Sequence, residues 1–218
     1  MNTALEMIKK DKVVAIARKV PVESITKLAE ALLLGGLHCI EVTFDHASAQ
    51  AEAETLVGIR MLTEKFGDSM AIGAGTVLKV EEVIAAHAAG AKYIISPNTD
   101  AAVIAKTKEL GMLSIPGAFT PPEIVEAYAL GADFVKLFPA ANFGTAYIKA
   151  VRAPLSHIPV LAVGGVNPEN IGSFLAAGCA GAGCGGGLVS LDAIKKGDFA
   201  SITAVARAYT EAVLAAQK

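Results

Sequence analysis

The sequence predicts a single α/β domain folded as a (β/α)8 TIM barrel, and three observations lead to this prediction. Short β-branched segments alternate with longer amphipathic ones, the alternation occurs eight times, and most of the amphipathic segments end at a glycine. The chain has 218 residues, of which 53% are hydrophobic and 18% charged, so it must bury a large core. No linker or low-complexity segment divides residues 1–218, which are expected to form one domain.

The predicted strands are short, apolar and rich in β-branched residues. They cover residues 13–18, 39–44, 71–77, 93–97, 113–119, 134–139, 160–165 and 180–186. Amphipathic segments between them are predicted as crossover helices, at 22–34, 49–66, 80–88, 99–109, 122–129, 147–151 and 168–176. A doubly wound α/β sheet shows the same alternation, so periodicity alone leaves that architecture open.

Helix boundaries carry their own markers. Pro21, Thr120 before Pro121, and Asn167 before Pro168 are typical of helix starts. Five helices are predicted to end at a glycine in the left-handed conformation before the next strand begins. These glycines are Gly36, Gly90, Gly111, Gly131 and Gly178.

Composition narrows the classes of partner. The net charge is −2, with 19 basic and 21 acidic residues, which gives no electrostatic reason to bind nucleic acid or an anionic membrane. Apolar stretches such as 28–40 are interrupted well before they could span a bilayer, and the first residues do not resemble a signal peptide. We therefore expect a cytoplasmic protein with a small-molecule partner, in which Cys39, Cys179 and Cys184 are packing residues.

Lys136 is an ionisable residue within an otherwise apolar strand, FVKLF. Burial disfavours the ammonium form, and a neutral amine can attack a ketone to form a Schiff base. The sequence leaves two other interpretations open. The side chain could extend out of the strand to water, or it could neutralise Glu41 in a buried ion pair.

Glu41 and Arg18 are the other charged residues of the predicted strands. A barrel brings strands two and six to opposite walls of one cavity, where Glu41 could move protons near a Schiff base. Arg18 offers a planar fork for a substrate carboxylate. As alternatives, Glu41 could be a structural partner of Lys136 or Arg18, and Arg18 could form a salt bridge with Asp45 or Glu41.

Two glycine-rich turns follow the seventh and eighth predicted strands, at Gly164-Gly165 and at Gly185-Gly186. In phosphate-binding barrels the loops at these positions present backbone N–H groups to the phosphate, and glycine lets it approach closely. The hydroxyls of Thr43 and Thr76 add candidate substrate contacts. Among the histidines only His46 is expected near the mouth of the barrel. No spacing of His and carboxylate residues predicts a metal site, so no metal and no cofactor are expected.

Several segments together carry a resemblance to a known family. They are IEVTF around Glu41, GAGTV around Thr76, IISPN around Pro97, FVKLFPA around Lys136, VGGVNPEN and the last glycine-rich turn. In this order they resemble the 2-keto-3-deoxy-6-phosphogluconate (KDPG) aldolase family, which includes aldolases of 2-keto-3-deoxy-6-phosphogalactonate and 4-hydroxy-2-oxoglutarate. The resemblance covers nearly the whole chain.

The resemblance implies a class I aldolase, a homotrimer of (β/α)8 barrels that needs no metal. Lys136 matches the Schiff-base lysine, and Glu41 matches the residue that moves protons as the sugar acid is cleaved to pyruvate and glyceraldehyde 3-phosphate. Arg18 would bind the pyruvyl carboxylate. The other residues of the pyruvyl pocket would be Thr76, Pro97 and Phe138.

Three positions depart from the phosphogluconate pattern. Asp45 stands where some members carry an arginine, which leaves carboxylate binding to Arg18. Val163 replaces a threonine, as in the phosphogalactonate-type relatives, and Gly186 replaces a serine of the phosphate site. We expect weak discrimination between the C4 epimers or a preference for the galactonate-derived one.

Two other functions stay open on the sequence. A phosphate-binding isomerase or epimerase could use Lys136 and Glu41 without a covalent intermediate. A non-catalytic barrel that binds a phosphorylated ligand is disfavoured, because it would carry two costly buried charges without a use for them. Borohydride reduction in the presence of pyruvate separates these functions from an aldolase.

Overall fold

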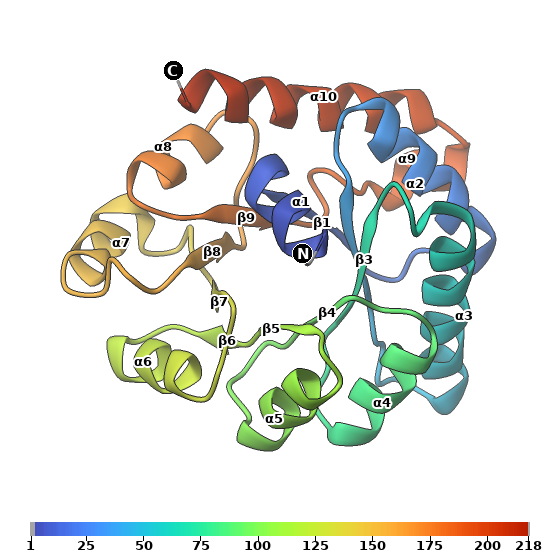
Figure 1. Cartoon of the computed structure of the whole chain (residues 1–218). Coiled ribbons are helices and arrows are strands. Elements are labelled where there is room, and N and C mark those ends of the chain that lie inside the picture. Colours follow the sequence, from blue (N-terminus) through green and yellow to red (C-terminus); the bar gives the residue numbers. More distant parts are fainter. Residues whose placement is uncertain (1–2, 218) are drawn as a thin grey trace.

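The computed structural model describes residues 3–217, in which parallel strands gather at the centre of a ring of helices (Figure 1). The sheet order is β5-β4-β3-β2-β1-β9-β8-β7-β6, so the first and last strands are neighbours. The two ends of this order, β5 and β6, are separated only by Pro116, so the sheet closes into a barrel and is not doubly wound. The strands are β1 (Val13–Ala17), β2 (Cys39–Thr43), β3 (Ala71–Gly75), β4 (Tyr93–Ile95), β5 (Leu113–Ile115), β6 (Gly117–Ala118), β7 (Val135–Leu137), β8 (Val160–Val163) and β9 (Gly181–Cys184).

The fifth strand of the barrel is divided at Pro116. We predicted one strand over 113–119, but β5 pairs with β4 and β6 pairs with β7. Proline has no N–H for a sheet ladder, and the carbonyl of Pro116 instead accepts from the N–H of Lys136 at 2.8 Å. The predicted eight-stranded barrel is therefore confirmed, with its fifth strand in two pieces.

The other strands end one or two residues before the predicted ends. The backbone leaves the extended conformation there, with φ of 57° at Thr76 and 96° at Gly164. Most residues just beyond the strand ends, Arg18 and Thr76 among them, line the cavity described below. These short strands thus place functional side chains in the loops at the carboxyl end of the barrel.

Helices surround the barrel on its outside and, in the case of α1, cover the amino-terminal ends of the strands (Figure 1). They are α1 (Thr3–Asp11), the 3-10 helix η1 (Val22–Ser24), α2 (Ile25–Leu34), α3 (Ala49–Phe66), α4 (Val80–Ala88), α5 (Ala101–Glu109), α6 (Pro121–Ala129), α7 (Gly144–Arg152), α8 (Ile171–Ala176), α9 (Leu191–Lys196) and α10 (Phe199–Ala216). Helices α1, α9 and α10 were not among the predicted segments. Among residues 3–217, no helix is both long and apolar enough to cross a membrane.

The expected helix ends are largely confirmed. Thr120 and Glu123 form a reciprocal capping box at the start of α6. The five predicted glycines after the helices all have positive φ, from 72° at Gly111 to 106° at Gly131. The start after Asn167 is wrong, because residues 168–170 form a turn and α8 begins at Ile171.

The barrel interior is apolar near the amino-terminal ends of the strands and more polar nearer their carboxyl ends. Ala4 and Ile8 of α1 pack with Val14, Tyr93 and other inward side chains to fill the amino-terminal part. Glu41 and Lys136 lie in the middle of β2 and β7, and Lys136 lines the cavity described below. The three cysteines are free and buried, consistent with packing residues.

Candidate active site

A cavity of about 720 Å³ lies at the carboxyl ends of the strands. It contains all the predicted site residues except Glu41 and Thr43, namely Arg18, Thr76, Pro97, Lys136, Phe138, Val163, Gly164, Gly165, Gly185 and Gly186. Asn167 lines it as well, next to the predicted glycine turn. Residues from strands on opposite sides of the barrel therefore share one space, as active sites of this fold do.

Lys136 lies in the middle of β7, and its side chain is buried, with 5% exposed. Burial lowers the pKa of Lys136, the nearby Arg18 charge lowers it further, and the Glu41 carboxylate opposes the shift. The ammonium nitrogen lies 5.2 Å from the centre of the Phe138 ring. The side chain does not extend out to water, and its burial disfavours the ammonium form relative to an exposed lysine.

Glu41 is buried on β2, with 1% of the residue exposed, and it does not line this cavity. Burial raises the pKa of Glu41, while the charges of Lys136 and Arg18 lower it in part. Its Oε2 has no hydrogen-bond partner in the described residues. Gly75 makes room for that oxygen, because a Cβ there would lie 2.2 Å from it. The charges of Glu41 and Lys136 thus influence each other's pKa, and Glu41 Oε2 is not held by another group among the described residues.

Arg18 is exposed at the end of β1 and contacts Thr76. Its Nη2 donates to Thr76 Oγ1 at 3.3 Å. Arg18 does not form the salt bridge with Asp45 that the sequence left open. Asp45 Oδ2 instead lies 3.7 Å from Lys19 Nζ. The Arg18 guanidinium therefore keeps most of its donors for a ligand in the cavity.

The glycine turns face the same cavity. Gly164 and Gly165 have φ of 96° and 75°, and a Cβ on Gly165 would lie 2.4 Å from the Cβ of Ala141. A Cβ on Gly186, by contrast, would meet no heavy atom within 4 Å. In the part of the chain that the structure describes, the N–H groups of Gly165 and Gly186 donate to no protein acceptor. They are available to an anion.

Thr43 does not join the other predicted residues. Its hydroxyl donates to the Ala17 carbonyl at 3.4 Å, and it lines a separate cavity of about 440 Å³ beside β1 and β2. We expected the Thr43 hydroxyl to contact the substrate, but the sequence does not reveal the backbone acceptor on the neighbouring strand.

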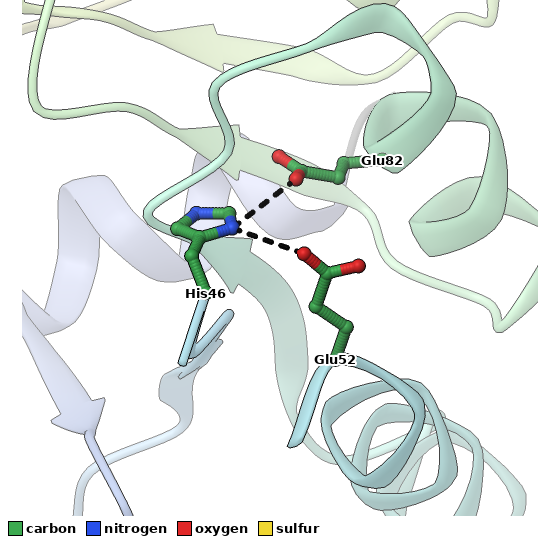
Figure 2. Close-up of side chains that lie close together, drawn as sticks. All are labelled: His46, Glu52 and Glu82. Atoms are coloured by element: carbon green, nitrogen blue, oxygen red, sulfur yellow. Dashed lines mark hydrogen bonds and ion pairs between the residues drawn. The ribbon is translucent and has the colours of Figure 1, made fainter. Parts of the chain in front are cut away.

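Sequence reasoning missed a cluster beside the cavity. One ligand atom each of His46, Glu52 and Glu82 lies within 4.8 Å of the others, although we expected no metal site (Figure 2). Glu52 and Glu82 lie in the first turns of α3 and α4. The signal was available, because helices that follow neighbouring parallel strands begin side by side.

A barrel with a buried lysine, a buried carboxyl group, an arginine and two glycine turns around one cavity defines a lyase of the Schiff-base aldolase class. The chain belongs to the KDPG and KHG aldolase family. The model of this family, described as "Aldolase: KDPG and KHG aldolase", matches residues 5–205. The resemblance noted in the sequence is thereby confirmed.

The relatives that the chain resembles in sequence are named as aldolases of this family. The chain is 37% identical over 201 residues to the 2-dehydro-3-deoxy-6-phosphogalactonate aldolase of Escherichia coli strain K12, covering 92% of this chain and 95% of that one. It is 35% identical to the 2-dehydro-3-deoxy-phosphogluconate aldolase of Treponema pallidum strain Nichols, covering 95% and 96%.

Solved structures of relatives have the same fold. A structure described as native KDPGal superposes with a TM-score of 0.84 at 34% identity, over 94% of this chain and 95% of that one. The KDPG aldolase of Legionella pneumophila, solved with pyruvate captured as a covalent carbinolamine, also has a TM-score of 0.84. Its identity is 28%, over 94% of this chain and 97% of that one.

Proposed function

We propose that this aldolase cleaves a 2-keto-3-deoxy-6-phospho sugar acid to pyruvate and glyceraldehyde 3-phosphate, through a Schiff base on Lys136. The observation that carries the proposal is the shared cavity, which holds a buried amine, an arginine and two glycine turns. These groups match the ketone, the carboxylate and the phosphate of such a substrate. The names of the relatives and the carbinolamine of the Legionella enzyme support it.

In the first step the neutral Lys136 amine attacks the C2 ketone carbon and forms a carbinolamine, which loses water to give an iminium ion. The lowered pKa of Lys136 raises the share of amine able to attack. Arg18 holds the adjacent carboxylate and so orients the carbonyl carbon towards the amine.

In the second step Glu41, as the carboxylate, takes the C4 hydroxyl proton directly or through water. The C4–O bond becomes a carbonyl, the C3–C4 bond breaks, and its electron pair moves into the iminium to give an enamine. Glyceraldehyde 3-phosphate leaves. Glu41, now protonated, returns its proton to C3, and water hydrolyses the iminium to release pyruvate and the amine. The raised pKa of Glu41 suits a group that must both accept and donate.

For the substrate, we propose weak discrimination between the C4 epimers or a preference for the galactonate-derived one. Val163 lines the cavity and offers no hydroxyl to the substrate. Phosphate would be bound by the N–H groups of Gly165 and Gly186. Pro97 and Phe138 would enclose the pyruvyl methyl side.

We also propose that the protein works as a cytoplasmic homotrimer, as the family resemblance implies. Exposed apolar side chains such as Tyr128, Leu130 and Phe143 offer surface for subunit contacts. Sedimentation at several protein concentrations tests the trimer.

The deciding experiment compares retro-aldol cleavage of both phosphorylated epimers and their unphosphorylated forms, with pyruvate detection. It is paired with borohydride reduction in the presence of pyruvate. A stable adduct on Lys136 together with cleavage is expected. An isomerase or epimerase would interconvert a phosphorylated sugar without any adduct, and that result would overturn the proposal.

A further inference from the structure

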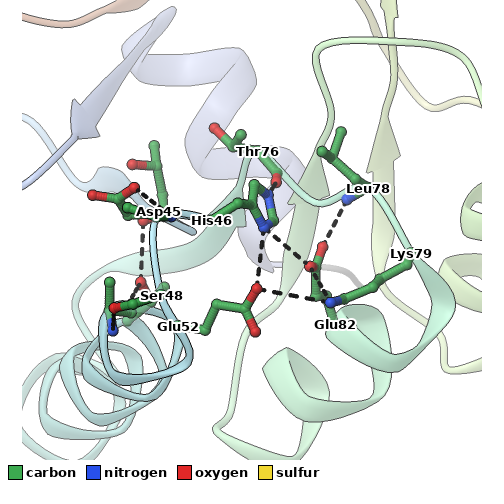
Figure 3. A network of polar contacts seen from close by, with 12 residues as sticks. Asp45, His46, Ser48, Glu52, Thr76, Leu78, Lys79 and Glu82 are labelled. Atoms are coloured by element: carbon green, nitrogen blue, oxygen red, sulfur yellow. Dashed lines mark hydrogen bonds and ion pairs between the residues drawn. The ribbon is translucent and has the colours of Figure 1, made fainter.

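A polar network lies just outside the cavity, after β2 and β3 (Figure 3). His46 follows β2, and its Nε2 lies 3.0 Å from the carbonyl oxygen of Thr76, which follows β3. A carbonyl oxygen only accepts hydrogen bonds, so Nε2 carries a proton and donates it. The imidazole therefore ties the loop after β2 to a residue that lines the cavity.

Two carboxylates hold the other side of the ring. His46 Nδ1 lies 3.3 Å from Glu52 Oε1 and 3.4 Å from Glu82 Oε1, and both side chains point at the ring (Figure 2). The second oxygen of Glu82 accepts from the N–H of Leu78 at 2.7 Å, so this buried carboxylate also holds the loop after Thr76. The Phe44 ring is stacked on the imidazole with an interplanar angle of 10°.

The three side chains could bind a cation, but an ammonium group already faces their carboxylates. Lys79 Nζ lies 3.4 Å from Glu82 Oε1 and 3.7 Å from Glu52 Oε1. A divalent ion would have to displace it. Partial burial alone would lower the pKa of His46, but the bond to Thr76 and the two carboxylates raise it overall, which favours a ring that donates from both nitrogens. These contacts indicate a network of ion pairs that fixes the ring.

Thr76 is the residue on which this network acts. Its φ of 57° lies in the left-handed region, which a β-branched side chain rarely adopts. Its Oγ1 accepts from Arg18 Nη2 at 3.3 Å. The peptide that His46 holds therefore determines where the hydroxyl meets the guanidinium.

We propose that His46 is a positioning residue for Arg18. By holding the Thr76 carbonyl, it keeps the Thr76 hydroxyl against the guanidinium and directs that group at the carboxylate of the bound keto acid. The inference rests on the proposed function, in which Arg18 binds this carboxylate. His46 contacts no reacting atom, so it acts on affinity for the carboxylate and not on the chemistry of Lys136.

The test measures the pyruvate concentration that gives half-maximal reductive trapping. His46→Leu is expected to raise it by about 3- to 10-fold, as loss of one hydrogen bond does, with an unchanged maximal rate. His46→Gln should restore most of the affinity, because its amide N–H can still donate to the Thr76 carbonyl. His87→Leu, on the exposed face of α4, is the matched control and should behave as wild type. Methyl pyruvate, a neutral ester, should show no difference between the variants.

A double-mutant cycle shows whether His46 acts through Arg18. In an Arg18→Met background, His46→Leu should add no further loss. Full additivity, or an unchanged half-saturation in folded His46→Leu, would overturn the inference. If Arg18→Met alone leaves pyruvate affinity intact, the carboxylate role in the proposed function fails and this inference fails with it.

Two further measurements complete the test. Glu52→Gln keeps the shape of the network but removes one charge, and it should weaken pyruvate affinity in the same direction. An unaltered affinity in both Glu52→Gln and His46→Leu would exclude the network from any role. Dialysis against a chelator should leave pyruvate affinity unchanged, whereas a loss restored by Zn²⁺ would replace the positioning role with a metal site.

Discussion

At the scale of single residues, the buried amine of Lys136 determines what its replacements can do. Methionine fills a similar volume without an amine, and arginine stays protonated, so neither can form an imine. We predict that Lys136→Met and Lys136→Arg both lose cleavage and pyruvate trapping. Lys136→Met should unfold at an equal or higher temperature than wild type, because it no longer buries an amine that water would hydrate. Mass spectrometry after borohydride reduction and thermal unfolding check both parts, and turnover in either variant without another labelled lysine would refute the Schiff base.

The coupling of Lys136 to Glu41 predicts a pH dependence with a definite sign. Since burial lowers the pKa of Lys136, the initial rate of reductive trapping with pyruvate should rise with pH and level off below the ordinary lysine value of about 10.4. The Glu41 charge raises the pKa of Lys136, so Glu41→Gln should move this midpoint to lower pH. Trapping itself should persist in that variant while cleavage falls by roughly 10²- to 10⁴-fold. A midpoint that moves upward would show that the two groups are not coupled as described.

The same shift has a consequence for stability. Between the lowered pKa and the ordinary lysine value, the unfolded chain binds more protons than the folded one, so Lys136 makes stability rise with pH in this window. Lys136→Met should remove that slope. Denaturant unfolding of both proteins across the window measures it.

Val163 controls the choice between epimers in our proposal. It is buried at the edge of the cavity, and threonine has nearly the same shape with one added hydroxyl. A neutral hydrogen bond contributes about 0.5–1.5 kcal/mol, so Val163→Thr should shift the ratio of kcat/KM values by about 2- to 10-fold towards the gluconate-derived epimer. Steady-state kinetics on both epimers decide this, and a strong gluconate preference in the wild type would contradict it.

The two glycine turns should respond differently to an added side chain. The turn after β8 should not tolerate one at Gly165, whereas the turn after β9 should accept one at Gly186. Gly165→Ala combines a positive φ with a Cβ too close to Ala141. The turn must shift, and we expect a loss of about 10- to 100-fold in kcat/KM for phosphorylated substrates, as misplaced binding groups cause. The unphosphorylated substrate should be affected much less.

Gly186→Ala, in the turn after β9, is the matched control for Gly165→Ala, because the Cβ added at position 186 would enter open space. It should retain near-normal kinetics. Equal losses on phosphorylated and unphosphorylated substrates in Gly165→Ala would mean that the turn supports the fold and not a phosphate.

The stability of the barrel as a unit depends on α1, which fills the interior near the amino-terminal ends of the strands. Ile8 is 1% exposed and packs into the apolar cluster there. Ile8→Ala should reduce the free energy of unfolding by about 2–5 kcal/mol, as other buried truncations do. Because the cavity with Lys136 lies at the other end of the strands, kcat should change little. Leu34→Ala, at a side chain that is 70% exposed, should stay within about 0.5 kcal/mol of wild type in denaturant unfolding.

The sequence predicted the barrel and most of its cavity because these depend on local patterns. Strand and helix alternation, glycine at helix ends and a lysine inside an apolar strand are all visible in short windows. The division at Pro116 was not predicted, since the proline lies in an apolar run that fits a continuous strand. The α1 helix was missed because its charged outer face hides the two buried positions, Ala4 and Ile8.

The site residues that were misjudged depend on contacts between elements. Thr43 has the right residue type on the right strand, but its hydroxyl is bound to the neighbouring strand. The network around His46 joins two helix starts and a loop that lie far apart in the sequence. Such contacts follow from the packing of α3 beside α4, which no single segment encodes.

The open space beside Gly186 leaves room for the substrate preference of this barrel to change during evolution. A serine there would place a hydroxyl in the cavity without moving a neighbour or straining the backbone. In the proposed phosphate site, a single replacement at position 186 would therefore strengthen or relax phosphate binding without disturbing the turn. Gly165 offers no such path, because any side chain there disturbs the turn itself. Ancestral and modern forms of the barrel should thus diverge at the β9 turn while the β8 turn stays fixed.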